Sequence, residues 1–462
     1  MDKAECRDWA AENFGSAELG DRRRVRRLVS LGAGAALRPA GPVTQVYESS
    51  AEREAAFRFL ENTDVRPEAV AKAVFDATAR RCMGKGYVIV ATDATSLSLR
   101  DRAMRRELGR VGSRSRPTRG LHVMNALAVD SNGVPQGLLA QRWWARDKAV
   151  KARRNHRKCF GKRFQQTETA HWVDTLVEVD ERLRAHGAAR PWFQLDRGGD
   201  AWPVFDAAVQ HKLLLTVRAK ANRRLLLDNG RVGYLDPFMR RQPVLGHFEI
   251  DIPAQPGRAA RRARLAVRSC AVTIHARVQK KRRVPIRMYA VVVEEIGRRK
   301  QDRLRWMLLT TCKTETFNAA RKVIRAYCAR WRVEEFHRAW KSGVCNIEDT
   351  QLQSRSAILK WATILAAVAA RAVRLAYLVR STPEAPASTE FTEDEITAAF
   401  LIGKKKRPAK DSETIAVVID RIADIGGFSH KYSGKKPGPT ILARGLERIE
   451  LLAMGLRNLR EM

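Results

Sequence analysis

The chain has 462 residues, of which 87 are Lys or Arg and 50 are Asp or Glu, so its formal net charge is +37. An apolar share of 45% argues against a disordered chain, and the length predicts roughly two to four domains. A charge of this size strains a compact fold unless a polyanion neutralises it, and the usual polyanion is nucleic acid. We therefore expect a nucleic-acid partner; the alternative is an Arg-rich, solvated surface.

The cysteines and the apolar segments indicate where the protein works. The seven cysteines are scattered without a C-x-x-C pair, which argues against a zinc site or a disulfide framework and predicts reduced thiols in a cytoplasm. The N-terminal residues, MDKAECRDWA, have no apolar stretch typical of a secretion signal. Residues 357–379 are apolar but are interrupted by Lys360, Arg371 and Arg374, so a buried helix is expected there and no membrane span.

Residues 1–70 are interpreted as a small helical DNA-binding domain. Helices are expected at 22–37 and at 51–61, the second capped by Ser50. The first half of the first helix carries the cations Arg22, Arg23 and Arg26. Cations at this end oppose the helix dipole, so the arrangement favours phosphate contact over helix stability.

Residues 71–350 alternate strand-like and helical segments. Strands are expected at 87–91, 121–130, 133–143, 192–195, 213–217 and 306–310, and helices at 166–187, 201–210 and 315–343. Residues 220–305 interrupt this order with short β-type runs and are interpreted as a β-rich insertion. The pattern predicts a mixed α/β core.

Residues 351–462 are expected to be helical. Helices are predicted at 354–380, 391–402, 412–424 and 440–460. The last helix carries apolar residues from Ile441 to Leu459 at spacings of mostly three and four, which make a stripe one face wide. Gly445 and Gly455 would let another helix approach closely. We interpret the stripe as a self-pairing surface; the alternative is that it packs on the rest of the chain.

Two acidic residues, Asp93 and Asp196, each follow an apolar strand. If the two strands are neighbours in the sheet, both carboxylates lie at one edge. Two adjacent carboxylates repel each other and favour a bound dication, and oxygen ligands suit Mg²⁺. Taken alone, an Asp in this position more often caps the following turn.

A third acidic residue lies on the helix expected at 315–343. At about 100° per residue, one stripe of this helix holds four polar side chains. They are Tyr327, Arg330, Glu334 and Lys341. The stripe fits a metal-binding Glu flanked by phosphate-binding groups, and it fits equally well a solvated face in which Arg330 and Glu334 form an i,i+4 ion pair.

These motifs resemble those of the bacterial cut-and-paste DDE transposases of the Tn-five type. The family's helix motif, Tyr-x2-Arg-x3-Glu-x6-Lys, is matched by Tyr327, Arg330, Glu334 and Lys341. Asp93 stands in Asp-Ala-Thr-Ser-Leu, which is similar to the family's first-aspartate motif. Asp196 opens Asp-Arg-Gly-Gly-Asp, where the family has Asp-Arg-Glu-Ala-Asp.

The likeness extends from about residue 9 to 460. Leu19-Gly-Asp-Arg-Arg and Ala56-Phe-Arg-Phe-Leu60 look like the family's N-terminal domain, and the region from Gly426 onwards looks like its dimerisation region. The strand with Trp306 is similar to the one whose Trp stacks on a flipped base of the DNA end. An extruded base needs such an aromatic platform to replace its lost stacking. Core packing is the alternative for Trp306.

The resemblance implies a ribonuclease-H-like catalytic core with a β-rich insertion, between a helical DNA-binding domain and a helical dimerisation domain. It implies that Asp93, Asp196 and Glu334 bind two Mg²⁺ ions, with Mn²⁺ as a substitute. Phosphate contacts are then expected from Tyr327, Arg330, Lys341, Arg218 and Lys220.

The resemblance also implies the reaction and the partners. A homodimer would bring two transposon ends together on the bacterial nucleoid, nick and open them through hairpins, and join the 3′ ends to target DNA. Two other functions remain open. The first is a ribonuclease-H-like nuclease without strand transfer, since the same acids serve both. The second is a non-catalytic DNA-binding protein derived from a transposase.

Overall fold

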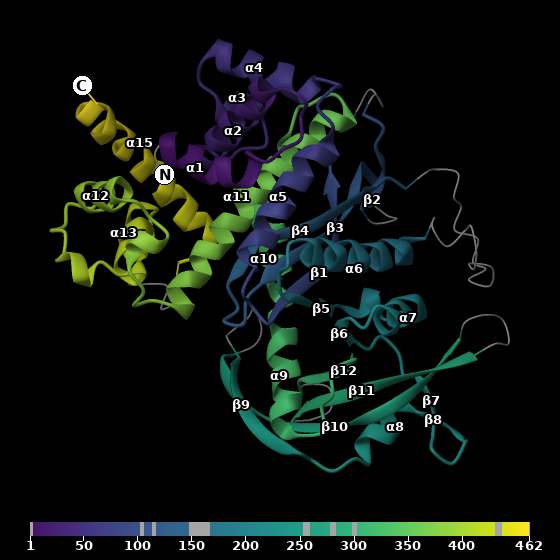
Figure 1. Cartoon of the computed structure of the whole chain (residues 1–462). Coiled ribbons are helices and arrows are strands. Elements are labelled where there is room, and N and C mark those ends of the chain that lie inside the picture. The colour runs from purple at the N-terminus through teal and green to yellow at the C-terminus, as the bar shows by residue number, and fades with distance from the viewer. Residues whose placement is uncertain are drawn as a thin grey trace.

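The computed structural model describes residues 3–101, 106–112, 117–146, 167–252, 259–277, 283–297, 303–429 and 437–461. The strands within these residues join in one sheet through the middle of the molecule (Figure 1). They are β1 (Tyr87–Ser98), β2 (Gly109–Gly112), β3 (Pro117–Val129), β4 (Pro135–Trp144), β5 (Arg190–Leu195), β6 (Leu214–Arg218), β7 (Arg224–Leu226), β8 (Val232–Tyr234), β9 (Gly246–Ile252), β10 (Arg261–Arg277), β11 (Arg283–Glu295) and β12 (Arg305–Thr310).

The upper half of this sheet has the order β4-β3-β1-β5-β6. β1 pairs antiparallel with β3, and β3 with β4, while β5 lies parallel to both β1 and β6. Parallel neighbours need a crossover connection, and α7 (Trp202–Gln210) makes the one from β5 to β6. α6 (Glu168–Ala185) precedes β5. The mixed α/β core expected from the sequence is therefore present.

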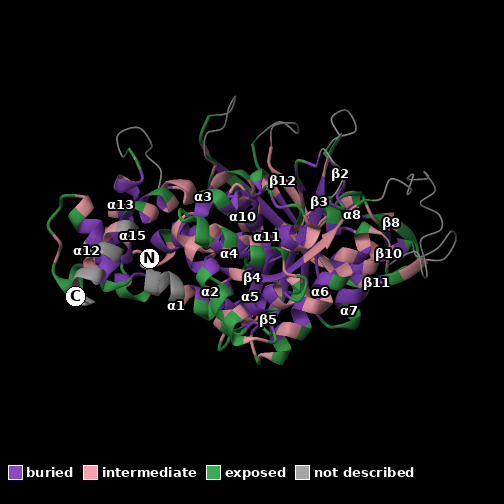
Figure 2. Ribbon diagram, turned by 90° about the horizontal axis from the view of Figure 1, so that it is seen from above, coloured by how far each residue is buried: buried purple, intermediate pink, exposed green. Residues whose placement is uncertain are grey.

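Alternating residues of β1 serve two apolar layers. Val88 and Val90 pack with α6 and α7 on one face, while Ile89 and Ala91 pack on the other. The helices of that second face are α5 (Pro67–Arg81), α9 (Phe317–Cys328), α10 (Trp331–Arg338) and α11 (Arg355–Ser381). Figure 2 shows the buried residues gathered along the sheet and α11, with exposed residues around the rim.

The strands between residues 220 and 305 extend the same sheet. β12 pairs with β6 on one side and with β11 on the other, and β11 continues to β10. β9 and β7 both pair with β10, and the short helix α8 (Leu235–Arg240) follows β8. The segment adds strands to the lower edge of the sheet in Figure 1.

The N-terminal part is helical, as expected. It consists of α1 (Lys3–Phe14), α2 (Arg22–Leu37), α3 (Val43–Val46) and α4 (Ser50–Glu61). The bounds of α2 agree with the sequence-based expectation. The expected cap of α4 was wrong by one residue: the Ser49 hydroxyl, not that of Ser50, accepts the N–H of Glu52 at 3.1 Å.

The helix α11 is the apolar segment that was expected to be buried, and 89% of its most apolar 18-residue window is buried. Its polar groups bind backbone carbonyls of the N-terminal helices. The Lys360 ammonium donates to the carbonyls of Leu60 and Asn62 at 2.8 and 2.7 Å, and the Trp361 indole donates to Gly41 at 2.7 Å. Burial lowers the pKa of Lys360 to about 8.

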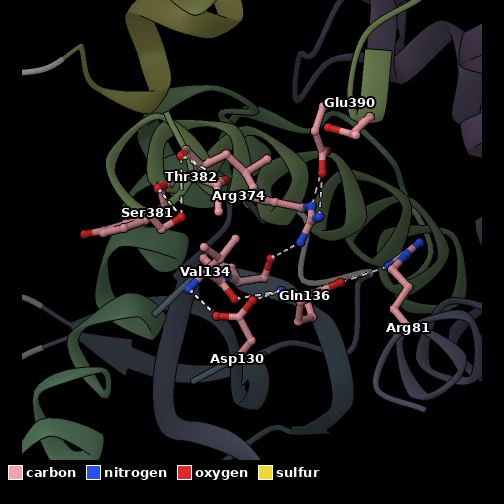
Figure 3. A network of polar contacts seen from close by, with 12 residues as sticks. Arg81, Asp130, Val134, Gln136, Arg374, Ser381, Thr382 and Glu390 are labelled. Carbon is pink, nitrogen blue, oxygen red and sulfur yellow. Dashed lines mark hydrogen bonds and ion pairs between the residues drawn. The ribbon is translucent and has the colours of Figure 1, made fainter. Parts of the chain in front are cut away.

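A polar network fixes the turn between β3 and β4 to the surrounding helices (Figure 3). The Asp130 carboxylate accepts the N–H of Val134 at 3.0 Å and the side-chain amide of Gln136 at 2.9 Å. Arg81 of α5 donates to the Gln136 carbonyl at 2.9 Å. Arg374 of α11 donates to the Pro135 carbonyl at 3.2 Å and to Glu390 at 2.6 Å.

The remaining helices follow α11 and lie to one side of the molecule (Figure 1). They are α12 (Glu393–Ile402), α13 (Ile415–Ile425) and α15 (Pro439–Glu461). Short 3-10 turns at Ala387–Thr389 and Lys410–Ser412 connect them.

The self-pairing interpretation of the last helix is wrong for the first half of its stripe. Leu442, Leu446 and Ile449 are buried within the chain's own core, where α15 packs on α11, α12 and α13. Gly445 explains the close contact, because a Cβ there would lie 1.8 Å from the Ile422 carbonyl oxygen of α13. Deleting residues 440–462 would therefore expose this core and would not leave the fold intact.

Lys360 gives a test of how α11 is anchored. Replacing Lys360 by Met keeps most of the apolar volume but leaves the carbonyls of Leu60 and Asn62 without their donor. We expect Lys360→Met to lower the free energy of unfolding by about 2–4 kcal/mol, measured by urea denaturation. Lys406→Met, at an exposed lysine, is the control. An unchanged unfolding midpoint for Lys360→Met would contradict the anchoring role.

Candidate active site

Two of the predicted acidic residues lie on neighbouring parallel strands. Asp93 lies inside β1, opposite Asn125 of β3, and not beyond the end of the strand as expected. Asp196 directly follows β5 and caps the 3-10 turn Arg197–Gly199, since its Oδ1 accepts the N–H of Gly198 at 2.7 Å. Because Thr92 lies opposite Leu195 in the parallel register, the two carboxylates occur at the same level of the sheet.

The long helix expected at 315–343 is not continuous. α9 ends at Cys328, α10 begins at Trp331, and the backbone then forms a π-helical turn, η3 (Ala339–Gly343). The stripe expected for a straight helix is nevertheless confirmed in part, because Arg330 interacts with both Tyr327 and Glu334. Glu334 lies on α10, Tyr327 on α9 and Lys341 in η3.

Arg330, at the break between α9 and α10, joins two of the three acidic residues. Its guanidinium donates to Asp93 Oδ2 at 3.0 Å and also binds the carboxylate of Glu334. The Arg330 side chain is only 11% exposed, and that of Asp93 18%. The i,i+4 ion pair anticipated as an alternative for Arg330 and Glu334 is thus present, and it reaches Asp93 as well.

The cluster of three carboxylates and the Arg330 guanidinium contains more negative than positive charge. The pKa of Asp93 is raised to about 7, mainly by burial and also by the nearby Asp196 and Glu334, while Arg330 acts in the opposite direction. One guanidinium therefore does not fully offset three neighbouring carboxylates. A site of this kind favours a further cation.

Asp93, Asp196 and Glu334 are the side chains that would hold a metal ion in this cluster. Among the described residues, no three His, Cys, Asp or Glu side chains converge closely enough to hold an ion together. Arg330 lies between Asp93 and Glu334. The donors are carboxylate oxygens, the ligands that Mg²⁺ and Mn²⁺ prefer, and an added dication would relieve their repulsion. The donor chemistry fits the ion once the Arg330 contacts are broken.

Three further predicted residues surround the carboxylates. The ring of Trp306 lies 6.4 Å from that of Tyr327, centroid to centroid, at a tilt of 59°. Arg218, at the end of β6, interacts with Tyr327, and burial lowers the pKa of Arg218. Burial also raises the pKa of Tyr327. A phenol, a guanidinium and a half-buried indole thus occupy one side of the cluster.

The other predicted residues are less closely associated with the carboxylates. Lys341 contacts Glu348 at 3.5 Å, and Glu348 accepts the N–H of Ser98, so Lys341 lies beside the end of β1. Lys220 is exposed, with its backbone N–H bound to Asp200. Three of the five arginines of α2 were predicted to contact DNA, and they are exposed on the N-terminal helices, away from the carboxylates. They are Arg22, Arg23 and Arg26.

Sequence reasoning missed a buried network behind Glu334. His337, one turn further along α10, bonds Asn125 through Nε2 at 3.0 Å, and Gln141 donates to the Asn125 amide oxygen at 2.8 Å. Asn125 is the residue paired with Asp93 across the sheet. The network therefore ties the helix that carries Glu334 to the strand beside Asp93. The only signal in the sequence was the i,i+3 spacing of Glu334 and His337.

The Gly-Gly departure after Asp196 also has a structural reason. A Cβ at Gly198 would lie 2.9 Å from Asp196 Oδ1 and 3.1 Å from the ring of Trp172. Trp172, on α6, is buried and occupies the space that a larger residue at 198 would need. The second Asp of the motif, Asp200, is structural, because it binds Arg223 at 3.0 Å.

The buried network predicts a pH dependence. Burial lowers the pKa of His337 to about 3, with the cations Lys341 and Arg330 acting in the same direction. Because the unfolded His titrates near 6.5, the unfolded state binds the extra proton between these two values, so stability is full above pH 6.5 and falls as the pH drops towards 3. His337→Gln should remove this loss, which approaches about 1.4 kcal/mol per pH unit.

The measurement is urea unfolding of the wild-type and His337→Gln proteins between pH 7 and 4. Carboxylates titrate in both proteins, so the difference between the two curves isolates the histidine. Parallel curves over this range would contradict the neutral, buried state of His337.

Three family models match the chain in order. The model described as "Transposase DNA-binding" matches residues 6–65, "Transposase DDE domain" matches 163–370, and "Transposase Tn5 dimerisation domain" matches 367–462. The middle range contains Asp196 and Glu334, while Asp93 precedes it. This succession accounts for the basic N-terminal helices, the carboxylate-bearing α/β core and the helices of the C-terminal third. The chain belongs to the DDE transposases of the Tn5 type, with DNA and a second copy of itself as partners.

Proposed function

We propose that this chain is the transposase of a bacterial cut-and-paste element. It binds the ends of the element, cleaves them and joins their 3′ ends to target DNA. The observation that carries the proposal is the gathering of Asp93, Asp196 and Glu334, two of which bind Arg330, with an uncompensated negative charge in a protein whose net charge is +37.

The proposal includes a ribonuclease-H-like core. The order β4-β3-β1-β5-β6, with three antiparallel strands followed by two parallel ones, supports this assignment. We also infer the division into residues 1–70 for end binding, 71–350 for catalysis with 220–305 inserted, and 351–462 for dimerisation.

In the proposed mechanism Asp93, Asp196 and Glu334 hold two Mg²⁺ ions, or Mn²⁺ in their place. When bound, the ions activate the attacking hydroxyl and stabilise the leaving oxygen of an in-line displacement. Arg330 now contacts both Asp93 and Glu334, so its guanidinium has to turn away before these residues can serve as ligands. The phosphate of an incoming DNA strand is the natural acceptor for it.

The neighbouring residues position the DNA in this mechanism. Tyr327, Arg218 and Lys341 supply a phenol and two cations for the phosphates beside the scissile bond. Trp306 offers its half-buried ring as the platform for a base turned out of the stack while a hairpin forms. A nuclease without strand transfer remains the second candidate, and a strand-transfer assay with a precut end separates the two.

The carboxylates give the first test. Asp93→Asn, Asp196→Asn and Glu334→Gln should each reduce nicking at the element's end by about a thousandfold or more, because metal stabilisation of the transition state amounts to several kcal/mol. Binding of the end fragment should be retained, since affinity comes mainly from phosphate contacts over the basic surface. Nicking gels and electrophoretic shifts on the same fragment measure both.

Glu335→Gln is the matched control. Glu335 is adjacent on α10 but accepts the Tyr377 hydroxyl at 2.5 Å and does not contact Arg330. Near wild-type nicking by Asp93→Asn, Asp196→Asn or Glu334→Gln would remove that residue from the proposed site.

Trp306 gives a test of the hairpin step. Trp306→Ala should allow first-strand nicking but reduce hairpin formation by roughly tenfold or more, because base–aromatic stacking contributes about 1–3 kcal/mol. Denaturing gels that resolve nicked, hairpin and double-cut products provide the readout, with Trp306→Phe as the variant that retains a ring. An equal loss at every step would indicate a packing role against Tyr327 instead.

A further inference from the structure

A strongly basic cavity of about 590 Å³ lies away from the carboxylates. It lies between α9, the turn Ser131–Gly133 and the first residues of β1. None of the described residues that line it is Asp or Glu. Four of them are cations: Arg321, Lys322, Arg325 and Arg332.

These cations are placed by specific contacts. Lys322 Nζ lies 4.5 Å from the centre of the Tyr87 ring, over its face. Arg332 donates to the Gly133 carbonyl at 3.0 Å and lies 3.6 Å from the centre of the Tyr377 ring. The nearest carboxylate to Arg332 is Glu335, at 3.8 Å and outside the cavity lining. The positive charge of the cavity is therefore largely uncompensated by the described residues around it.

The cavity is separate from the candidate active site. Tyr87 and Asp93 lie on the same face of β1, but they are six positions apart, which corresponds to about 20 Å of strand. The two sites also use opposite sides of α9. Tyr327 is buried and faces the carboxylates, whereas Lys322 and Arg325 are exposed on the outer side of the helix.

We propose that this cavity and the outer side of α9 bind the phosphate backbone of a second DNA duplex, one that is not held at the carboxylates. From Arg321 to Arg332 the chain advances by about 16 Å, enough to contact two or three successive phosphates. The side-chain amides of Asn132 and Asn318 add neutral donors of the kind that commonly bind phosphate oxygens.

The contact is independent of DNA sequence. The face of Tyr87 is covered by Lys322, so the cavity offers no free aromatic platform on which a base can stack. The described residues that line the cavity offer charged groups and amides to the DNA phosphates. They do not present a helix that could enter a groove of the duplex. Such a surface suits DNA that arrives with any sequence, and it goes beyond the proposed chemistry at the carboxylates.

The test uses Lys322→Ala/Arg325→Ala, which removes two exposed cations. Full-length protein is first saturated with unlabelled end duplex, and binding of a labelled duplex of unrelated sequence is then titrated over a range of KCl concentrations. The slope of log K against log salt should become less steep by about 1.8, or 0.9 for each lost phosphate contact. Lys405→Ala/Lys406→Ala, with the same change of charge at exposed lysines, should keep the wild-type slope.

Nicking of the end duplex distinguishes this proposal from the one on the carboxylates. The Lys322→Ala/Arg325→Ala protein should bind and nick an end at the wild-type level. A wild-type salt slope for this variant, an equal loss in the control, or a matching loss of end nicking would each overturn the second-duplex site.

Discussion

The burial of α11 is the constraint on which the other elements depend. This helix runs through the apolar layer behind the sheet, and its few polar groups each bind a different part of the chain. Lys360 and Trp361 bind carbonyls of the N-terminal helices, and Arg374 binds the turn after β3. The Trp340 indole donates to the Ala362 carbonyl at 3.0 Å, which fixes the end of the helix that carries Glu334. The N-terminal helices, the helix that carries Glu334 and the sheet are thus all held by contacts with one buried element.

The candidate site combines this rigidity with an unfavourable charge arrangement. Buried acidic residues are costly unless they are paired, and here Asp93 and Glu334 share one guanidinium while the nearby Asp196 adds a third negative charge. Arg330, at the break between α9 and α10, binds both Asp93 and Glu334. The network through His337 and Asn125 then holds the two backbone segments in place. The fold positions the carboxylates and leaves their charge to be balanced by what binds there.

Much of this arrangement was predictable from sequence. Strand and helix periodicity predicted α2, the core strands and the buried α11. The resemblance to the family motif predicted that Asp93, Asp196 and Glu334 form one site. The break at Ala329–Arg330 was not predictable, because the surrounding residues all favour a helix. Likewise, an apolar stripe predicts that one face of a helix is buried. It does not indicate whether the same chain or a second chain covers that face. Only the packing of Gly445 on Ile422 shows that α13 of the same chain covers it.

The packing around Gly198 constrains how this sequence can diverge further. Trp172 is buried against the glycine, and any side chain at position 198 would meet both its ring and the Asp196 carboxylate. A Glu at position 198 therefore requires the Trp172 ring and the Asp196 carboxylate to shift. A smaller residue at 172 alone would leave a void in a buried layer. The two positions therefore constrain each other through direct packing, and substitutions at both are expected to have non-additive effects on stability.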